Sequence, residues 1–339
     1  MSQKDKILVT GASGFIAGHI IIDLLNQGYQ VRGTIRDLAK ADKLRAMFAL
    51  HTDKADSIEL VAATLTEVDC WAAAVDGCDA IFHIASPVPL EQPKNPDAIV
   101  IPAREGALNV LKAAHNAGIS RVIMTSSVAA VAVHADSDKA PQTEANWSDV
   151  NFPKITPYAL SKTIAEKAAW EYVESVGTIK LTTVQPALVL GPALEADYGS
   201  SLEALMKLLR GDLPMIPKLG FGIVDVRDVA ELHRIAYEND ASIGKRLLCS
   251  NGFRWFAGIS AQLIKEFPAY KKKLPTIEMP YILVRVLAIF DKVIASIVDD
   301  IGRVVEYDCT TAKALGWNPR SPEEAISAGA KSLIDLKIV

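Results

Sequence analysis

Short apolar runs rich in β-branched residues alternate with longer helical patterns through the first half of this chain. In the helical stretches, apolar residues recur every three or four positions, which is typical of helices that pack one face on a sheet. The clearest helices follow the first strand up to Gly28 and cover Ala103–Asn116. Six strands are expected, at Lys6–Thr10, Gln30–Ile35, Ser57–Ala62, Ala80–Ile84, Arg121–Ser126 and Lys180–Val189. This alternation predicts an α/β fold of the Rossmann type, with a doubly wound parallel sheet.

The pattern changes after Gly191, where the sequence becomes helix-rich and punctuated by prolines before one more strand at Arg246–Ser250. We therefore expect a discontinuous division of the chain. Residues 1–190 plus about 224–251 would form the dinucleotide-binding domain, and residues 191–223 plus 252–339 a smaller, helix-rich substrate-binding lobe. A ligand would lie between sheet and lobe, outside the carboxyl ends of the strands.

The charge balance favours small-molecule partners over nucleic acid or a membrane. Lys and Arg total 36 against 40 Asp and Glu, a net charge of -4, and no cationic block is present. Such a chain offers no electrostatic footprint for nucleic acid or an anionic lipid surface. Its charged start, without an apolar leader, predicts a cytoplasmic protein.

Two further features of the sequence bear on a membrane span and on a metal site. Tyr281–Val298 is markedly apolar, but Arg285, Asp291 and Lys292 interrupt it, so we expect a packed helix or a subunit contact, and either a monomer or a homodimer. The four cysteines match neither a zinc site nor a redox pair in their spacing, so no metal is expected.

A glycine-rich turn, which contains Gly11 and Gly14, stands between the first predicted strand and its helix. Gly11 permits the tight turn, and Gly14 lets the backbone approach a pyrophosphate. The N-terminus of the helix offers unpaired N–H groups and the positive end of the helix dipole. Because the turn lies where a strand passes into a helix, it predicts a dinucleotide site.

The end of the second predicted strand carries cations that bear on the choice of cofactor. Arg36 stands at the strand end, with Lys40 and Lys43 after it. An arginine there accommodates a 2′-phosphate, whereas a carboxylate would bind the free ribose hydroxyl. We therefore expect NADP, that is NADPH in its reduced form, while Asp37 keeps NAD open as an alternative.

Tyr158 and Lys162 stand four residues apart in a predicted helix, so their side chains share one face. A phenol titrates at about pH 10 in water, and a neighbouring ammonium stabilises the phenolate. Lys162 would supply that charge and bind the nicotinamide ribose, while Tyr158 would protonate a developing alkoxide. Ser127, at the end of the preceding strand, would hydrogen-bond the carbonyl oxygen. These side chains predict a proton relay for carbonyl reduction.

Taken together, these motifs resemble the extended short-chain dehydrogenase/reductase superfamily, and within it the dihydroflavonol-reductase-like branch with its microbial ketone and aldehyde reductases. The resemblance covers nearly the whole chain. It rests on TGASGFIA at Thr10–Ala17, VRGTIRD at Val31–Asp37, FHIASP at Phe82–Pro87, PAREGALNVL at Pro102–Leu111, TSS at Thr125–Ser127, YALSK at Tyr158–Lys162, QPALVLGP at Gln185–Pro192 and VDVRDVA at Val224–Ala230.

The resemblance implies an enzyme and a set of cofactor contacts. Thr64 takes the place of an aspartate that the family often places at the adenine, and Gln185 that of an asparagine. The catalytic serine would be Ser127 of the two adjacent serines. The implied cofactor contacts are Gly11, Ser13, Gly14, Phe15 and Ile16 at the pyrophosphate, Arg36 with Lys40 or Lys43 at the 2′-phosphate, Thr64 and Leu65 at the adenine, Ala85 and Ser86 along the cofactor, Tyr158 and Lys162 at the ribose, and Pro186, Leu188 and Val189 at the nicotinamide.

The segment Val128–Val133, after the predicted catalytic serine, is entirely small and apolar. The plant dihydroflavonol reductases, which this chain otherwise resembles, have a polar side chain there that binds a hydroxylated ring. We expect an apolar or aromatic ketone or aldehyde, with Phe152, Phe221 and Trp255 as candidate aromatic walls. Three alternatives stay open. They are a hydroxysteroid-type alcohol dehydrogenase, a sugar-nucleotide epimerase or dehydratase of the same superfamily, and a non-catalytic nucleotide sensor.

Overall fold

The computed structural model describes residues 4–88, 93–134, 136–196, 200–290 and 292–339. Its main feature is a seven-stranded sheet in the order β3-β2-β1-β4-β5-β6-β9, in which every pair of neighbours is parallel. The strand order reverses between β1 and β4, as in doubly wound folds, which confirms the predicted class. The strands are β1 (Lys6–Val9), β2 (Gln30–Ile35), β3 (Glu59–Ala62), β4 (Ala80–His83), β5 (Arg121–Thr125), β6 (Lys180–Pro186) and β9 (Arg246–Cys249).

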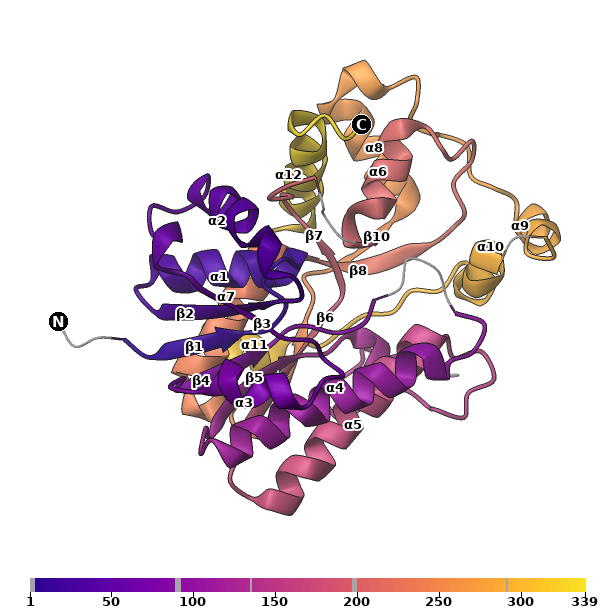
Figure 1. Ribbon diagram of the computed structural model, residues 1–339. Helices are drawn as coiled ribbons and strands as arrows, with labels where there is room; N and C mark the ends of the chain where they lie inside the picture. The colour runs from indigo at the N-terminus through magenta and orange to yellow at the C-terminus, as the bar shows by residue number, and fades with distance from the viewer. Residues whose placement is uncertain (1–3, 89–92, 135, 197–199, 291) are drawn as a thin grey trace.

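Helices cover both faces of this sheet (Figure 1). One face carries α1 (Phe15–Asn26), α2 (Ala41–Ala49), α7 (Val226–Glu238) and the short α11 (Thr310–Ala314), and the other carries α3 (Asp69–Val75), α4 (Asp97–Asn116) and α5 (Pro157–Val176). Each layer encloses its own apolar core, so both faces of the parallel sheet are buried.

Helix α4 begins six residues before its predicted start at Ala103, and it contains Pro102. Proline lacks an N–H and is disfavoured inside a helix, and the predicted start at Ala103 lies directly after it. Three bonds instead close the first turn, from Ala98 N–H to the Asn95 carbonyl and from Ile99 and Val100 N–H to the Pro96 carbonyl. The loss of one internal bond at Pro102 is therefore tolerated, because the helix is packed along its length.

The predicted strand Lys180–Val189 is in fact two strands, which belong to different sheets. Pro186 ends β6, Ala187 donates its N–H to the Cys249 carbonyl over 3.0 Å, and Leu188–Leu190 continues as β7. There β7 pairs with β8 (Gly220–Asp225), which in turn pairs with β10 (Phe253–Trp255). The prediction of a single strand was wrong because one apolar run serves two sheets in succession.

A third apolar core fills the region around this small sheet. It is enclosed by α6 (Glu203–Arg210), α8 (Phe256–Glu266) and α12 (Pro322–Asp335), which stand over the carboxyl ends of the large sheet in Figure 1. Of the segment 224–251, α7 and β9 pack with the large sheet, whereas Val224 and Asp225 lie in β8 of the small one. The domain boundaries expected above stay a prediction.

The apolar segment from Tyr281 folds as two short helices, α9 (Tyr281–Leu287) and α10 (Lys292–Ile297), at the edge of the molecule (Figure 1). Val284 is buried, while Ile282 and Phe290 are exposed. Asp291, one of the charges that interrupt the segment, lies outside the described residues, as do residues 1–3 at the charged start of the chain. No helix in the described ranges has the length and hydropathy that are needed to cross a bilayer.

Candidate active site

The glycine-rich turn lies at the carboxyl end of β1, next to the point where the strand order reverses. Gly11 has a φ of +72°, in the region that favours glycine, and a Cβ there would lie 3.0 Å from the Ala85 Cβ. The Thr10 hydroxyl accepts the N–H groups of Ile84 and Ala85, each over 2.9 Å. The turn is thus held against the segment after β4, so that two predicted cofactor contacts, Gly11 and Ala85, are brought together.

The start of α1 fits a pyrophosphate group. Its N-cap is Gly14, which provides no side-chain cap, and a Cβ at Gly14 would come within 3.2 Å of the Gly11 carbonyl oxygen. The N–H groups in the first turn, which includes Phe15 and Ile16, are therefore not capped by a side chain of their own helix. Ser13 is exposed in the same turn. An uncapped helix start beside glycine backbone is a site for phosphate oxygens.

The three cations predicted to bind the 2′-phosphate differ in whether they form an ion pair with the protein. Arg36 and Lys40 are exposed at the end of β2, and neither side chain forms an ion pair within the described residues. Lys43 instead lies 3.1 Å from Glu195, in the loop after β7. Asp37 caps a short turn, since its Oδ1 accepts the Ala39 N–H over 3.0 Å.

The predicted contacts along the middle of the cofactor lie on both sides of α4. Leu65 packs against Gly106 of α4, where a Cβ would lie 3.0 Å from the leucine Cβ, and Thr64 is half-buried beside it. Ala85, Ser86 and Lys162 line one small cavity. The fold therefore brings the segment after β4 to the lysine of the predicted relay, which supports a shared ligand for these residues.

The three residues predicted at the nicotinamide are separated by the junction between β6 and β7. Pro186 ends β6, Leu188 lines the large cavity described below, and the Val189 side chain is buried in the core beneath the large sheet. Pro186 and Leu188 are therefore placed at the carboxyl edge of the sheet. Val189 can contribute to such a site only through its backbone.

The relay residues come from two neighbouring elements. Ser127 follows β5 and caps the short 3-10 helix η3 (Val128–Ala130), because its Oγ accepts the Ala129 N–H over 3.1 Å. Tyr158 and Lys162 lie on α5, and Lys162 Nζ is 5.7 Å from the centroid of the Tyr158 ring. Because η3 packs against α5, Ser127 lies at the helix that carries the other two residues.

Lys162 is buried, and its charge affects a neighbouring histidine. Burial lowers the pKa of His83 to about 3, and the Lys162 ammonium lowers it further in the same direction. The neutral ring of His83 lies 3.0 Å from the Thr10 hydroxyl, which holds the glycine turn. The buried charge of Lys162 and the neutral ring of His83 therefore belong to the same interior region, next to the glycine turn.

A buried polar cluster lies beneath the relay, and we call it the Glu166 cluster. Its centre is the fully buried carboxylate of Glu166, one helical turn after Lys162. Ser126 donates to Glu166 over 2.6 Å, Gln185 over 2.7 Å and Arg246 over 2.8 Å. Thr183 adds a fourth bond of 2.9 Å. The cluster joins the carboxyl end of β5, the carboxyl half of β6 and the first residue of β9 to α5.

Arg246 extends the Glu166 cluster to a loop. Its guanidinium donates to the carbonyls of Glu144 and Asn146 over 2.8 and 2.5 Å, and it stacks 3.7 Å from the Trp147 ring centroid. We did not predict Glu166 or Arg246 as site residues. One signal was present, because Glu166 follows Lys162 by four residues and thus shares its helix face.

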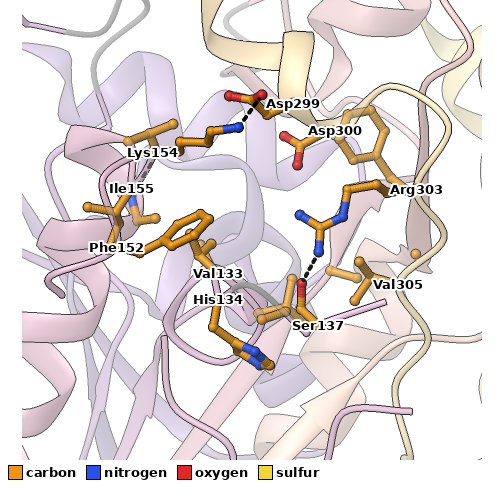
Figure 2. Close-up of a pocket in the computed structure, with 18 of the residues that line it drawn as sticks. Val133, His134, Ser137, Phe152, Lys154, Ile155, Asp299, Asp300, Arg303 and Val305 are labelled. Carbon is orange, nitrogen blue, oxygen red and sulfur yellow. Dashed lines mark hydrogen bonds and ion pairs between the residues drawn. The ribbon is translucent and has the colours of Figure 1, made fainter. Parts of the chain in front are cut away.

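A cavity of about 730 Å³ opens beside the relay. Val128 and Ala129, which follow Ser127, line it, as do Pro157 and Ala159 on either side of Tyr158. Neither Ser127 nor Tyr158 is itself among the described lining residues. The remaining wall is apolar over Ala132, Val133, Phe152, Ile155, Ala187, Leu188, Phe221 and Phe253, and charged over Lys154, Asp299, Asp300 and Arg303, which Figure 2 shows around the cavity.

Two of the three aromatic side chains expected to line the substrate site do line this cavity, and the third does not. Phe152 and Phe221 line it, but Trp255 does not belong to the described lining and instead meets Phe253 edge to face, with ring centroids 4.8 Å apart. Side chains alternate between the faces of a β-strand, so Phe253 and Trp255 share one face of β10. Of the two, only Phe253 lines the cavity. The charged part of the wall was not predicted.

The four cysteines are unpaired thiols, of which three are buried. Burial raises the pKa of Cys309 to about 11 and that of Cys249 well above its usual value. The described residues contain no group of three or more His, Cys, Asp or Glu side chains arranged to hold a metal ion.

A doubly wound sheet with an uncapped glycine turn and a Tyr–Lys pair on the helix after β5 defines the architecture of an extended short-chain dehydrogenase/reductase. The chain belongs to the NAD dependent epimerase/dehydratase family, whose model matches residues 7–248.

Similar proteins of this family include several reductases. Tetraketide alpha-pyrone reductase 1 of Arabidopsis thaliana is 40% identical over 254 residues, which cover 73% of this chain and 77% of the relative. Cinnamoyl-CoA reductase 1 of the same plant is 39% identical over 275 residues, 80% of this chain and 76% of the relative. The crystal structure of yeast methylglyoxal/isovaleraldehyde reductase complexed with NADPH superposes with a TM-score of 0.81 at 26% identity, and covers 98% of this chain and 99% of that one.

Proposed function

We propose that this chain is a carbonyl reductase that uses NADPH to convert an apolar or aromatic ketone or aldehyde into the alcohol, with Tyr158 as the proton donor. The broader class is an NADP-dependent oxidoreductase that acts on C=O and CH–OH groups, in keeping with the reductases named above. Arg36 and Lys40, which are exposed at the end of β2 and form no ion pair within the described residues, support NADPH over NADH.

The proposed chemistry divides between the cofactor and the chain. NADPH, when bound, supplies the hydride. The first turn of α1 would hold the pyrophosphate, and Lys162 would hold the nicotinamide ribose. Ser127 would hydrogen-bond the carbonyl oxygen, and Tyr158 would donate its phenolic proton to that oxygen as it becomes an alkoxide. The buried ammonium of Lys162 stabilises the phenolate that remains.

One observation carries the proposal. Residues adjacent in sequence to Ser127 and Tyr158 form part of the apolar wall of the large cavity. Val128 and Ala129 directly follow Ser127, and Pro157 and Ala159 flank Tyr158. A substrate in this cavity would present its carbonyl to the relay and its apolar body to this wall. The same side chains would serve alcohol oxidation in the reverse direction.

The test is the replacement Tyr158→Phe, assayed by the loss of NADPH absorbance with aryl ketones, aliphatic aldehydes and sugar nucleotides. Loss of a general acid lowers turnover by roughly 10²- to 10⁴-fold. NADPH binding, followed by its fluorescence, should persist, because the pyrophosphate site is untouched. Tyr172→Phe is the matched control, since it makes the same change on the same helix at a tyrosine away from the cavity.

Two results would contradict the proposal. Turnover of Tyr158→Phe within a few-fold of the unmodified protein would remove Tyr158 as the proton donor. Reduction or epimerisation confined to sugar nucleotides, with no apolar ketone or aldehyde consumed, would move the substrate class to the epimerase and dehydratase enzymes of the family.

A further inference from the structure

The charged part of the cavity wall comes largely from one segment of the chain, residues 295–305. This segment runs from the end of α10 through the 3-10 helix η7 (Val298–Asp300) and contributes Asp299, Asp300 and Arg303 to the wall. The opposite wall, with Ser137 and Lys154, comes from the loops between β5 and α5. Figure 2 shows these side chains facing one another across the cavity.

Each cation of the cavity already has an anionic partner. Lys154 lies 2.5 Å from Asp299. Arg303 donates to Asp138 over 3.2 Å and to the Ser137 hydroxyl over 2.9 Å. Both cations are therefore neutralised by carboxylates that belong to the protein, and an incoming anion would have to displace one of them.

Asp300 is the carboxylate that remains. Figure 2 shows it turned toward the interior of the cavity, between the two cations, and within the described residues its oxygens accept no hydrogen bond and form no ion pair at salt-bridge distance. Its exposed surface faces the cavity. The charged side chains of the lining, Lys154, Arg303, Asp299 and Asp300, balance in number, but Arg303 pairs with Asp138 outside the lining. Within the described residues, Asp300 is therefore the one charge of the cavity wall that has no ion-pair partner.

Asp300 is exposed, but the neighbouring protein and three charged side chains act on its carboxyl. Burial by the neighbouring protein raises the pKa of its carboxyl, Asp299 raises it as well, and Arg303 and Lys154 lower it. A carboxylate held in a partly enclosed site gains more from a hydrogen-bond donor than one in open water, because there is less water to compete.

We propose that Asp300 is a specificity residue, which favours carbonyl substrates that carry an ammonium group away from the reacting carbonyl and disfavours anionic ones. This inference rests on the proposed function and specifies its substrate class. The apolar wall would bind the body of the substrate, and Asp300 would accept hydrogen bonds from the ammonium. Polyanionic thioesters, such as the substrate that names the cinnamoyl-CoA reductases, would be disfavoured by the same charge.

The test uses three acetophenones that differ only at the para position, which bears methyl, aminomethyl or carboxymethyl. We would measure kcat/KM with NADPH at low ionic strength, at a pH where the amine is protonated. The aminomethyl ketone should exceed the methyl ketone by about tenfold, the effect of one hydrogen bond between charged groups. The carboxymethyl ketone should fall below both.

Asp300→Asn keeps the shape of the side chain and removes its charge, so the ratio of aminomethyl to methyl ketone should fall to about one. Asp335→Asn is the matched control, because it removes the same charge from the exposed end of α12, where Asp335 pairs with Lys331 outside the cavity lining. The control should keep the tenfold ratio.

The outcomes separate this inference from the function on which it rests. If the methyl ketone is reduced but the aminomethyl ratio is close to one, or is unchanged in Asp300→Asn, the specificity role is wrong and the reductase function stands. A preference for the carboxymethyl ketone would show that Arg303 or Lys154 exchanges its partner for a substrate anion, which also overturns the inference. If none of the ketones consumes NADPH, the proposed function fails, and the inference fails with it.

Discussion

Two ion pairs near the candidate site are almost equally short but stand in opposite surroundings. Glu166 and Arg246 meet over 2.8 Å with side chains that are 0% and 8% exposed, whereas Lys154 and Asp299 meet over 2.5 Å with exposures of 43% or more. Each pair joins segments that are far apart in the sequence. The comparison teaches that the length of an ion pair says little about its contribution, which depends on water and on the other bonds of each charge.

The difference in exposure also indicates different roles for the two ion pairs. Every contact of the Glu166 cluster is made with another part of the protein, so this pair fixes the ends of β5, β6 and β9 relative to α5. At the large cavity the Lys154–Asp299 pair is exposed and the Arg303–Asp138 pair is partly buried, and within the described residues neither pair includes Asp300. One region holds the site together, and the other is available to a ligand.

The largest effect should come from Glu166→Ala, which leaves Arg246 buried without its counterion. Breaking a buried pair by removal of one partner costs about 3–5 kcal/mol of unfolding free energy. Urea unfolding monitored by circular dichroism would measure this loss. Glu171→Ala is the control, because Glu171 lies exposed on the same helix. A loss below about 1 kcal/mol would show that the cluster is not tightly coupled to the fold.

An intermediate effect is expected for Ser126→Ala, which removes one of the bonds to the Glu166 carboxylate but leaves the ion pair in place. A hydrogen bond to a charged group is worth about 1.5–3 kcal/mol. The exposed Ser175, whose hydroxyl donates to a carbonyl of its own helix, is the control, and Ser175→Ala should change stability by no more than about 0.5 kcal/mol. Equal losses for the two serine variants would contradict the distinction between buried and exposed bonds.

The smallest effect should follow Lys154→Ala, since the exposed pair with Asp299 is worth roughly 0–1 kcal/mol. Salt screens exposed charges over about 3 Å at 1 M ionic strength, so the difference from the unmodified protein should shrink further there. Urea unfolding at low and high salt would measure both values. A loss of more than about 2 kcal/mol that salt leaves unchanged would place this pair in the same energetic class as Glu166 and Arg246.

Much of the large sheet could be predicted from the sequence, because its signals are local. Six of the seven strands begin and end within two residues of their expected bounds, since each is a short apolar run closed by a turn. The glycine turn was found for the same reason, as Gly11 and Gly14 stand directly between strand and helix. Tyr158 and Lys162 share a helix face, which follows from their spacing alone.

What could not be predicted depends on segments that only the fold brings together. Arg246 follows Glu166 by 80 positions, and Arg303 follows Asp138 by 165, so no local pattern connects either pair. The division of Lys180–Val189 between two sheets was hidden because both halves are equally apolar. Phe253 and Trp255 stand two positions apart on one face of β10, so the sequence pattern could not show that, of the two, only Phe253 lines the cavity.

The junction between β6 and β7 at Ala187 limits which parts of the cavity wall can change in sequence. Ala187 and Leu188 form one wall of the cavity, and their backbone is committed on one side to β9 and on the other to β8. The segment 295–305 belongs to no strand in the described chain, and through Asp299 and Arg303 it contacts the loops between β5 and α5. Substitutions accumulate at low cost where no sheet depends on them. A lineage that acquires new substrates would therefore vary the segment 295–305 first and keep the wall at Ala187 almost unchanged.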